Sequence, residues 1–148
     1  MSETTVSTAV ATTADTEVVP GRRVRPLSTI PANSFEERVA VLNILGASEP
    51  IKENLNKVIH VTNLIVQPVE MVDQETGQFG EVPRVTIVDK DGKSYHGTSS
   101  PLHRALTDIL FIMGDPSTWG TPVPVKITMG GSGTRQYFDV KVQPLNSK

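Results

Sequence analysis

The sequence has no cysteine, few aromatic residues and no long apolar run. The lack of cysteine excludes disulfide bonds, zinc ribbons and thiol catalysis. No apolar stretch approaches the roughly 18 residues that a membrane-spanning helix needs. Residues 1–20 also lack the basic start and apolar centre of a secretory signal. We therefore expect a cytoplasmic protein that has no membrane partner.

An excess of charge of one sign is missing as well. The chain has 14 Lys and Arg against 16 Asp and Glu, a formal net charge of −2. The charge balance therefore counts against a large basic surface of the kind that duplex-binding proteins use. A local basic groove can still lie on a near-neutral protein, so binding of a single strand stays open.

Signals for catalysis or metal binding are weak. His60, His96 and His103 are too far apart in sequence to form a metal motif. The Gly130-Gly131-Ser132-Gly133 stretch lacks the Lys-Ser/Thr pair that would follow in a phosphate loop. No nucleophile has a base in a recognised arrangement. We therefore expect no enzyme, no cofactor and no metal.

Residues 1–33 have the composition of a disordered tail. The first part is rich in Thr and Ala, and a basic segment from Arg22 to Arg25 follows it. Such a segment buries too little apolar surface to offset its loss of conformational entropy. The predicted domain therefore covers 34–144, and 145–148 form a short C-terminal tail.

One helix is predicted between Ser99 and Gly114. Ser99 or Ser100 can cap it, Pro101 suits its first turn, and Gly114 suits its end. Its apolar residues recur at helical spacing and form one stripe, which predicts packing on a core: Leu102, Ala105, Leu106, Ile109, Leu110 and Met113. Phe111 lies opposite this stripe, where it can contact a partner or be covered by the tail.

The rest of the domain favours strands. β-branched and alternating residues predict them at 57–71, 82–89, 94–98, 123–129 and 135–143. An Asp-Gly signal for a hairpin or a bulge lies at 90–93, and we count 94–98, which leads into the helix, with the strand before it. The segment 37–45, ERVAVLNIL, permits two interpretations. Ser34 and Glu37 could form a capping box that begins a helix, but Val39, Val41 and the stop at Gly46 favour a strand, which we predict.

The resulting order is three strands, one helix and two strands. This is the order of the OB-fold, a five-stranded barrel that binds oligonucleotides or oligosaccharides. The fold class is therefore predicted as mainly β: a five-stranded OB-fold barrel with one α-helix between the third and fourth strands, plus the disordered N-terminal tail.

Cationic and aromatic residues on the strands suggest a binding surface, because single strands need cations for phosphates and rings for bases. The predicted nucleic-acid-binding residues are Lys57, Phe79, Arg84, Lys93, Tyr95, Lys126, Arg135, Tyr137 and Lys141. A structural role competes at these positions, because cations are common on solvated strand faces and Tyr95 or Tyr137 could simply close the barrel. For Trp119, which lies in a loop, a role in closing the core is favoured over contact with a ligand.

The chain also resembles bacteriophage single-stranded-DNA-binding proteins with an OB-fold. The likeness covers roughly 37–143 and includes NKVIHVTNLIVQPVEM, the helix end DILFIMG and the strand TRQYFDVKV. It implies binding of single strands without a cofactor and extends a binding role to Arg84, Tyr95, Arg135 and Tyr137. The ending PLNSK departs from the acidic, partner-recruiting tail that is usual in bacterial relatives.

The function predicted from these observations is sequence-tolerant binding of single-stranded DNA, which coats and protects strands exposed during phage DNA replication in the host cell cytoplasm. Self-association and replication proteins are further candidate partners. The alternative is a phage structural or assembly protein that is built on a small β-barrel and acts through protein–protein contacts. An oligosaccharide-binding barrel that uses Trp119 is a third, weaker hypothesis.

Overall fold

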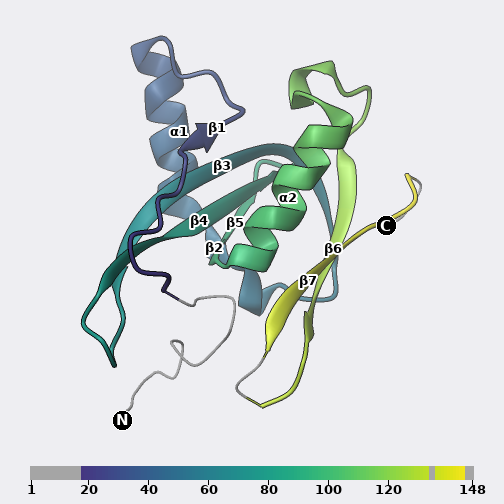
Figure 1. Cartoon of the computed structure of the whole chain (residues 1–148). Coiled ribbons are helices and arrows are strands. Elements are labelled where there is room, and N and C mark those ends of the chain that lie inside the picture. The colour runs from purple at the N-terminus through teal and green to yellow at the C-terminus, as the bar shows by residue number, and fades with distance from the viewer. Residues whose placement is uncertain (1–17, 134–135, 146–148) are drawn as a thin grey trace.

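Two long antiparallel strands form the centre of the structure, a computed structural model that describes residues 18–133 and 136–145. β3 (Val58–Val72) and β4 (Phe79–Asp89) pair over most of their length. Their many β-branched residues suit a pleated, half-buried surface. The register shifts between Val61 and Asn63, and such a bulge bends a strand and increases its twist. The result is a strongly curled sheet (Figure 1).

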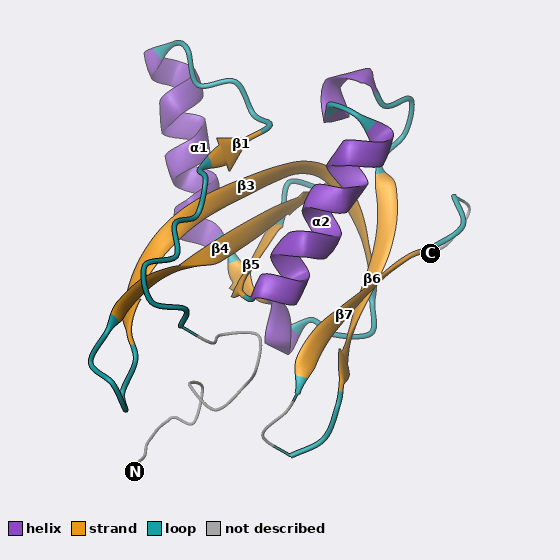
Figure 2. Cartoon of the chain, viewed as in Figure 1, coloured by secondary structure: helices purple, strands orange, loops and turns teal. Residues whose placement is uncertain are grey.

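Five further strands extend this pair in the order β2-β5-β4-β3-β6-β7, with β1 beside β3. Their bounds are Leu27–Ser28 (β1), Glu49–Pro50 (β2), Ser94–Thr98 (β5), Val123–Gly130 (β6) and Tyr137–Val142 (β7). Two single-turn 3-10 helices, Ile51–Glu53 and Pro116–Thr118, lie in the connections. Figure 2 shows two α-helices, one on each side of the sheet.

Helix α2 (Ser100–Met113) confirms the predicted helix. The Ser99 hydroxyl accepts the N–H of Leu102 at 3.0 Å. Gly114 ends the helix with a φ of 82°, and its N–H donates to the carbonyl of Leu110. Leu102 and Leu106 are buried in the core that α2 shares with the concave face of the sheet. The predicted stripe therefore does pack against the strands.

The prediction of a strand at 37–45 is wrong, because these residues belong to helix α1 (Phe35–Ala47). The capping box that we considered is present. The Ser34 hydroxyl accepts the N–H of Glu37, and the Glu37 carboxylate accepts the N–H of Ser34, both at 3.1 Å. These two bonds satisfy donors that a helix start leaves free. They outweigh the weak strand signal of Val39 and Val41.

The strand and helix counts also need correction. The described residues form seven strands and two helices, in place of five strands and one helix. Ser94–Thr98 is a separate strand, β5, antiparallel to β4 after a turn at Gly92, so the Asp-Gly signal marks a hairpin and the strand count rises by one. The strands β3 to β7 still follow the predicted order around α2. No β5–β7 pairing closes a barrel within the described residues, so the sheet is a half-barrel that is compatible with an OB-like fold.

The predicted tail at 1–33 needs a similar revision. Its first 17 residues lie outside the described residues, but 18–29 cross the sheet as a segment that we name the strap (Figure 1). The N–H of Gly21 donates to Phe79, β1 pairs with β3, and Val24 enters the core. The packed part of the chain therefore begins before residue 34. Hydrogen bonds to the edges of β4 and β3, together with the buried Val24 side chain, hold the strap in place.

Candidate nucleic-acid interface

The hairpin of β6 and β7 has one apolar and one polar face. Lys126 lies opposite Lys141, and Gly130 lies opposite Tyr137. Because side chains alternate along a strand, six residues share the outward side, which we name the β6–β7 polar face: Lys126, Thr128, Gly130, Tyr137, Asp139 and Lys141. On the other side Ile127 belongs to the core, and Phe138 and Val140 pack against it. The core thus fixes which side chains the hairpin presents outward.

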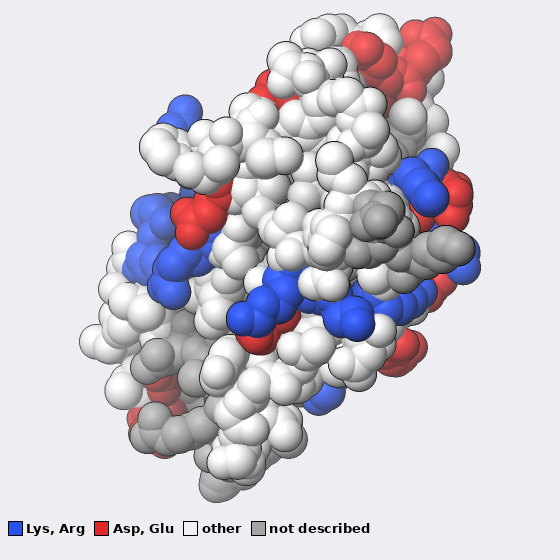
Figure 3. Space-filling model, turned by 90° about the vertical axis from the view of Figure 1, so that its right-hand side faces the viewer, with Lys and Arg blue, Asp and Glu red and all other residues white. Residues whose placement is uncertain are grey.

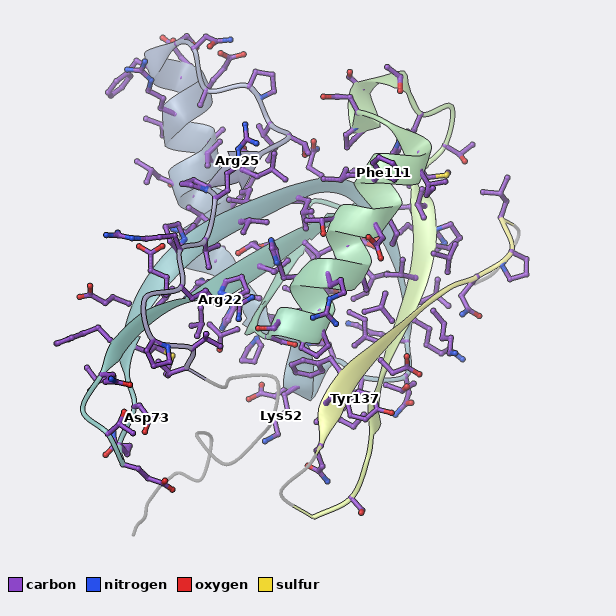
Figure 4. The ribbon with its side chains drawn as sticks, in the orientation of Figure 1. Arg22, Arg25, Lys52, Asp73, Phe111 and Tyr137 are labelled. Atoms are coloured by element: carbon purple, nitrogen blue, oxygen red, sulfur yellow. The ribbon has the colours of Figure 1, made fainter. Side chains whose placement is uncertain are left out.

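Tyr137 lies directly over the backbone of Gly130. A Cβ atom added to Gly130 would lie only 2.6 Å from Cζ and 2.8 Å from the hydroxyl oxygen of Tyr137. The absence of a side chain at Gly130 therefore lets the ring approach the strand. The residue remains 42% exposed, and Figure 4 shows it on β7. A ring that is supported in this way and still open to solvent suits stacking on a nucleic-acid base.

Two lysines provide positive charge on the same face. The Lys141 ammonium lies 3.9 Å from the Asp139 carboxylate, but an exposed pair of this kind is weak and is screened by salt. Lys126 forms no ion pair with any residue in 18–133 or 136–145. Arg135, the other cation predicted on this strand, lies outside the described residues. Both lysines can therefore contact phosphates near the Tyr137 ring.

Lys57 and Tyr95 form a cation–π pair. The Lys57 ammonium lies 4.7 Å from the centre of the Tyr95 ring. Tyr95 is only 3% exposed and belongs to the core, so its ring is not accessible to a base in this conformation. Lys57 is exposed and directly precedes Val58, the register partner of Lys126. Tyr95 thus supports an exposed cation at the start of β3, on the side of the strand opposite to Val58.

Arg84 lies elsewhere, beneath the end of α1. Its Nη2 donates to the hydroxyl of Ser48 at 3.4 Å, and Ser48 also bonds Nδ1 of His96 at 2.8 Å. Burial, and then the charge of Arg84, lower the pKa of His96. The Nε of Arg84 and the hydroxyl of Thr86 are buried without a partner among the described residues. This polar cluster belongs to α1 and not to the β6–β7 polar face.

The remaining predicted residues are also separate. Lys93 lines a cavity of about 420 Å³ between α1 and the β4–β5 turn. Phe79 is exposed at the start of β4, beside Gly21 and Arg22 of the strap. Of the predicted residues, the fold thus brings Lys126, Tyr137 and Lys141 together on the β6–β7 polar face and places Arg84, Lys93 and Phe79 elsewhere.

The sequence did not predict some residues that shape these surfaces, and it did not place others. The support of Tyr137 by Gly130 has a weak sequence signal, because a glycine before a Gly-rich turn is usually explained by the turn. Arg22 belongs to the predicted basic segment, but its contact with Ser100 could not be predicted, because it depends on the path of the strap. The indole N–H of Trp119 donates to the carbonyls of Met113 and Gly114, and the ring packs against the core. Trp119 therefore has a structural role at the end of α2.

Two other kinds of feature are absent from the described residues. No group of three or more His, Asp or Glu side chains there could hold a metal ion. No helix within that part of the chain is long and apolar enough to cross a membrane. What remains is a curled, mainly β sheet with an outward face of cations and a supported aromatic ring. These features are compatible with a protein that binds nucleic acids.

A comparison with known protein families shows which kind of nucleic-acid-binding protein the chain resembles. The family model described as phage single-stranded DNA-binding protein, of the Phi29 type, matches residues 23–142. The chain therefore belongs to this family, whose members are binding proteins rather than enzymes, and the predicted resemblance is confirmed. No curated protein and no solved structure matches the chain. The family supports single-stranded DNA as the partner.

Proposed function

We propose that the protein coats single-stranded DNA without reading its sequence, and that the β6–β7 polar face is its main contact surface. The observation that supports this most strongly is the Tyr137 ring, which lies on Gly130 and is still exposed. Every base has a stackable face, so one supported ring accepts any sequence. The OB-like curl of the sheet, which we propose as a variant of the OB-fold, presents this ring on its outer side.

Charge and stacking have separate roles in this proposal. Lys126 and Lys141 neutralise phosphates on either side of the stacked base, and Arg135 belongs to the same strand. Lys57, which lies over the Tyr95 ring at the start of β3, is a further phosphate contact in this proposal, separate from the β6–β7 polar face. Phosphate contacts of this kind release counterions and give affinity without specificity. Arg84, Lys93 and Phe79, which lie elsewhere, are not part of the proposed primary site.

Removal of the ring tests the site. Tyr137→Ala is expected to weaken binding to an oligo-dT strand by about 1–3 kcal/mol, the contribution of one stacked base, while Tyr137→Phe keeps most of it. Gly130→Ala should weaken binding in the same direction, because its Cβ displaces the ring. Gly120→Ala is the matched control, since a Cβ atom there meets no atom within 4 Å. Fluorescence anisotropy measures all four variants.

The outcomes separate the site from the function. Unchanged affinity in both Tyr137→Ala and Gly130→Ala would refute the site and leave the function standing. Failure of the unmodified protein to bind single strands, or equal affinity for duplex and single strands, would refute the function. Titrations with poly-dA, poly-dT and mixed sequences test the tolerance for sequence, for which we expect affinities that differ by less than the effect of Tyr137→Ala.

We further propose that the protein acts on DNA strands exposed during phage replication inside the host cell. A second candidate function, a phage structural or assembly protein, gains support from the end of α2. Phe111 is 85% exposed and Ile112 follows it on the surface, and exposed apolar side chains of this size often mark contacts between proteins. Retention on purified phage particles, together with no shift of any oligonucleotide in a gel, would favour this second function.

A further inference from the structure

The strap is held in a defined position beside β4. Its backbone lies so close to Gly80 that an added Cβ atom would come within 2.2 Å of the Val19 carbonyl oxygen. The N–H of Glu81 donates to the carbonyl of Arg22 at 3.0 Å, and the Glu81 carboxylate accepts the N–H of Val24 at 2.8 Å. These contacts fix where the basic segment lies on the surface.

Arg22 points from the strap toward the first turn of α2. Its Nη1 donates to the Ser100 hydroxyl at 2.8 Å, and Figure 4 shows Arg22 beside the start of α2. A guanidinium group has five N–H donors, and this is its only side-chain hydrogen bond within 18–133 and 136–145. The other donors of Arg22 can therefore bind a second acceptor.

Positive charge is concentrated around this contact. Ser100 and Arg104 are four residues apart on α2, so they lie on one face of the helix, and the Arg22 guanidinium bonds Ser100 there. Burial, and then the charges of Arg22 and Arg104, lower the pKa of His103 in the same turn. No carboxylate forms an ion pair with Arg22 or Arg104 among the described residues. The nearby Glu81 accepts the Val24 N–H and pairs with Arg23. Neither arginine is therefore neutralised by an ion pair within these residues, and the carboxylate of Asp108 lies one helical turn beyond Arg104.

We propose that Arg22 and Arg104 form a phosphate-binding surface, the strap–α2 site, which gives the bound DNA strand a second contact. This inference rests on the proposed function and adds a surface outside the β6–β7 polar face. In Figure 3, Lys and Arg atoms lie in several groups on the side of α2, β6 and β7, with Asp and Glu atoms between them. One group lies toward the face on which Figure 1 shows the strap and α2. The site contacts phosphates and adds affinity without specificity.

The dependence of binding on salt tests this site. For single strands, the slope of log K against log salt concentration changes by about 0.7 for each phosphate contact, so Arg22→Ala/Arg104→Ala should reduce it by about 1.4. The matched control is Arg38→Ala/Lys90→Ala, which removes two exposed cations that lie on α1 and on the β4–β5 turn. The control should leave the slope unchanged.

Displacing the strap tests the geometry separately. Gly80→Ala places a Cβ atom against the Val19 backbone and should lower the slope in the unmodified background. In the Arg22→Ala/Arg104→Ala background it should change the slope no further. An equal slope for the unmodified protein and the arginine variant would overturn this inference while leaving the proposed function intact. If the unmodified protein bound no single strand, the proposed function would fail and this inference with it.

Discussion

The two helices are nearly equal in length but differ in what holds them. α1 has 13 residues and α2 has 14, and each begins with a serine side chain as its N-cap. α2 buries Leu102 and Leu106, whereas no residue of α1 is buried. Polar contacts attach the end of α1 instead, such as the bond from the Ser94 hydroxyl to the Ile44 carbonyl at 2.9 Å. One helix is part of the core, and the other rests on it.

This difference separates two signals that are often read together. A capping box determines where a helix can begin, and an apolar stripe determines whether the helix packs on a core. α1 has the cap without the stripe, since Phe35 and Leu42 are both exposed. α2 has both. The comparison predicts that the same substitution will have very different effects in the two helices.

The largest expected difference concerns leucine truncation. Leu106→Ala, at a residue that is only 2% exposed, should lower the free energy of unfolding by roughly 2–5 kcal/mol through lost burial and a cavity. Leu42→Ala, at a residue that is 66% exposed, should change it by less than about 0.5 kcal/mol. Urea unfolding followed by circular dichroism compares the two variants. Similar losses in both would show that α1 packs as tightly as α2.

A smaller effect is expected for the cap of α2. Ser99 is buried, and its hydroxyl accepts the Leu102 N–H. Ser99→Ala leaves that buried donor without a partner and should cost about 1–2 kcal/mol of global stability. Ser99→Thr keeps the acceptor and should recover part of the loss, although its extra methyl group has to fit the site. A thermal melt that does not change for Ser99→Ala would contradict the importance of this cap.

The smallest effect is expected for the cap of α1. Ser34→Ala removes the exposed capping box and should weaken α1 by about 0.5–1 kcal/mol. Because α1 buries no residue, this loss should remain local. Hydrogen exchange should become faster at the first amides of α1, while the global melting temperature changes little. A decrease in the melting temperature as large as that of Ser99→Ala would show that the two helices unfold as one unit.

Much of the fold could be predicted because local signals agree with tertiary packing. α2 has a cap, a stripe and a Gly114 stop, and β3 and β4 have long β-branched runs. The segment 37–45 was wrongly predicted as a strand. Because α1 has no apolar stripe that indicates a helix, the prediction relied on the alternate spacing of Val39 and Val41. The order of strands around α2 survived this error because Ser94–Thr98 supplies the strand that 37–45 does not.

The candidate site was predicted only in part for a related reason. Alternation along 135–143 correctly separated Tyr137 and Lys141 from the core-facing Phe138. Tyr95 follows the same kind of alternation, yet its ring faces the core, since one strand alone does not indicate which face is buried. Arg22 could not be placed at all, because its contact with Ser100 joins residues 78 positions apart.

The strap also has a consequence for the solubility of the protein. It occupies the backbone edge of β4 at Phe79 and Glu81, and Thr29 occupies the edge of β3 at Leu64. Unpaired strand edges recruit strands from other molecules and lead to aggregation. Along coated DNA, in the proposed function, many copies lie at high local concentration. By covering two edges, the strap prevents neighbouring copies from joining their sheets there, so that the protein can crowd on DNA without aggregating.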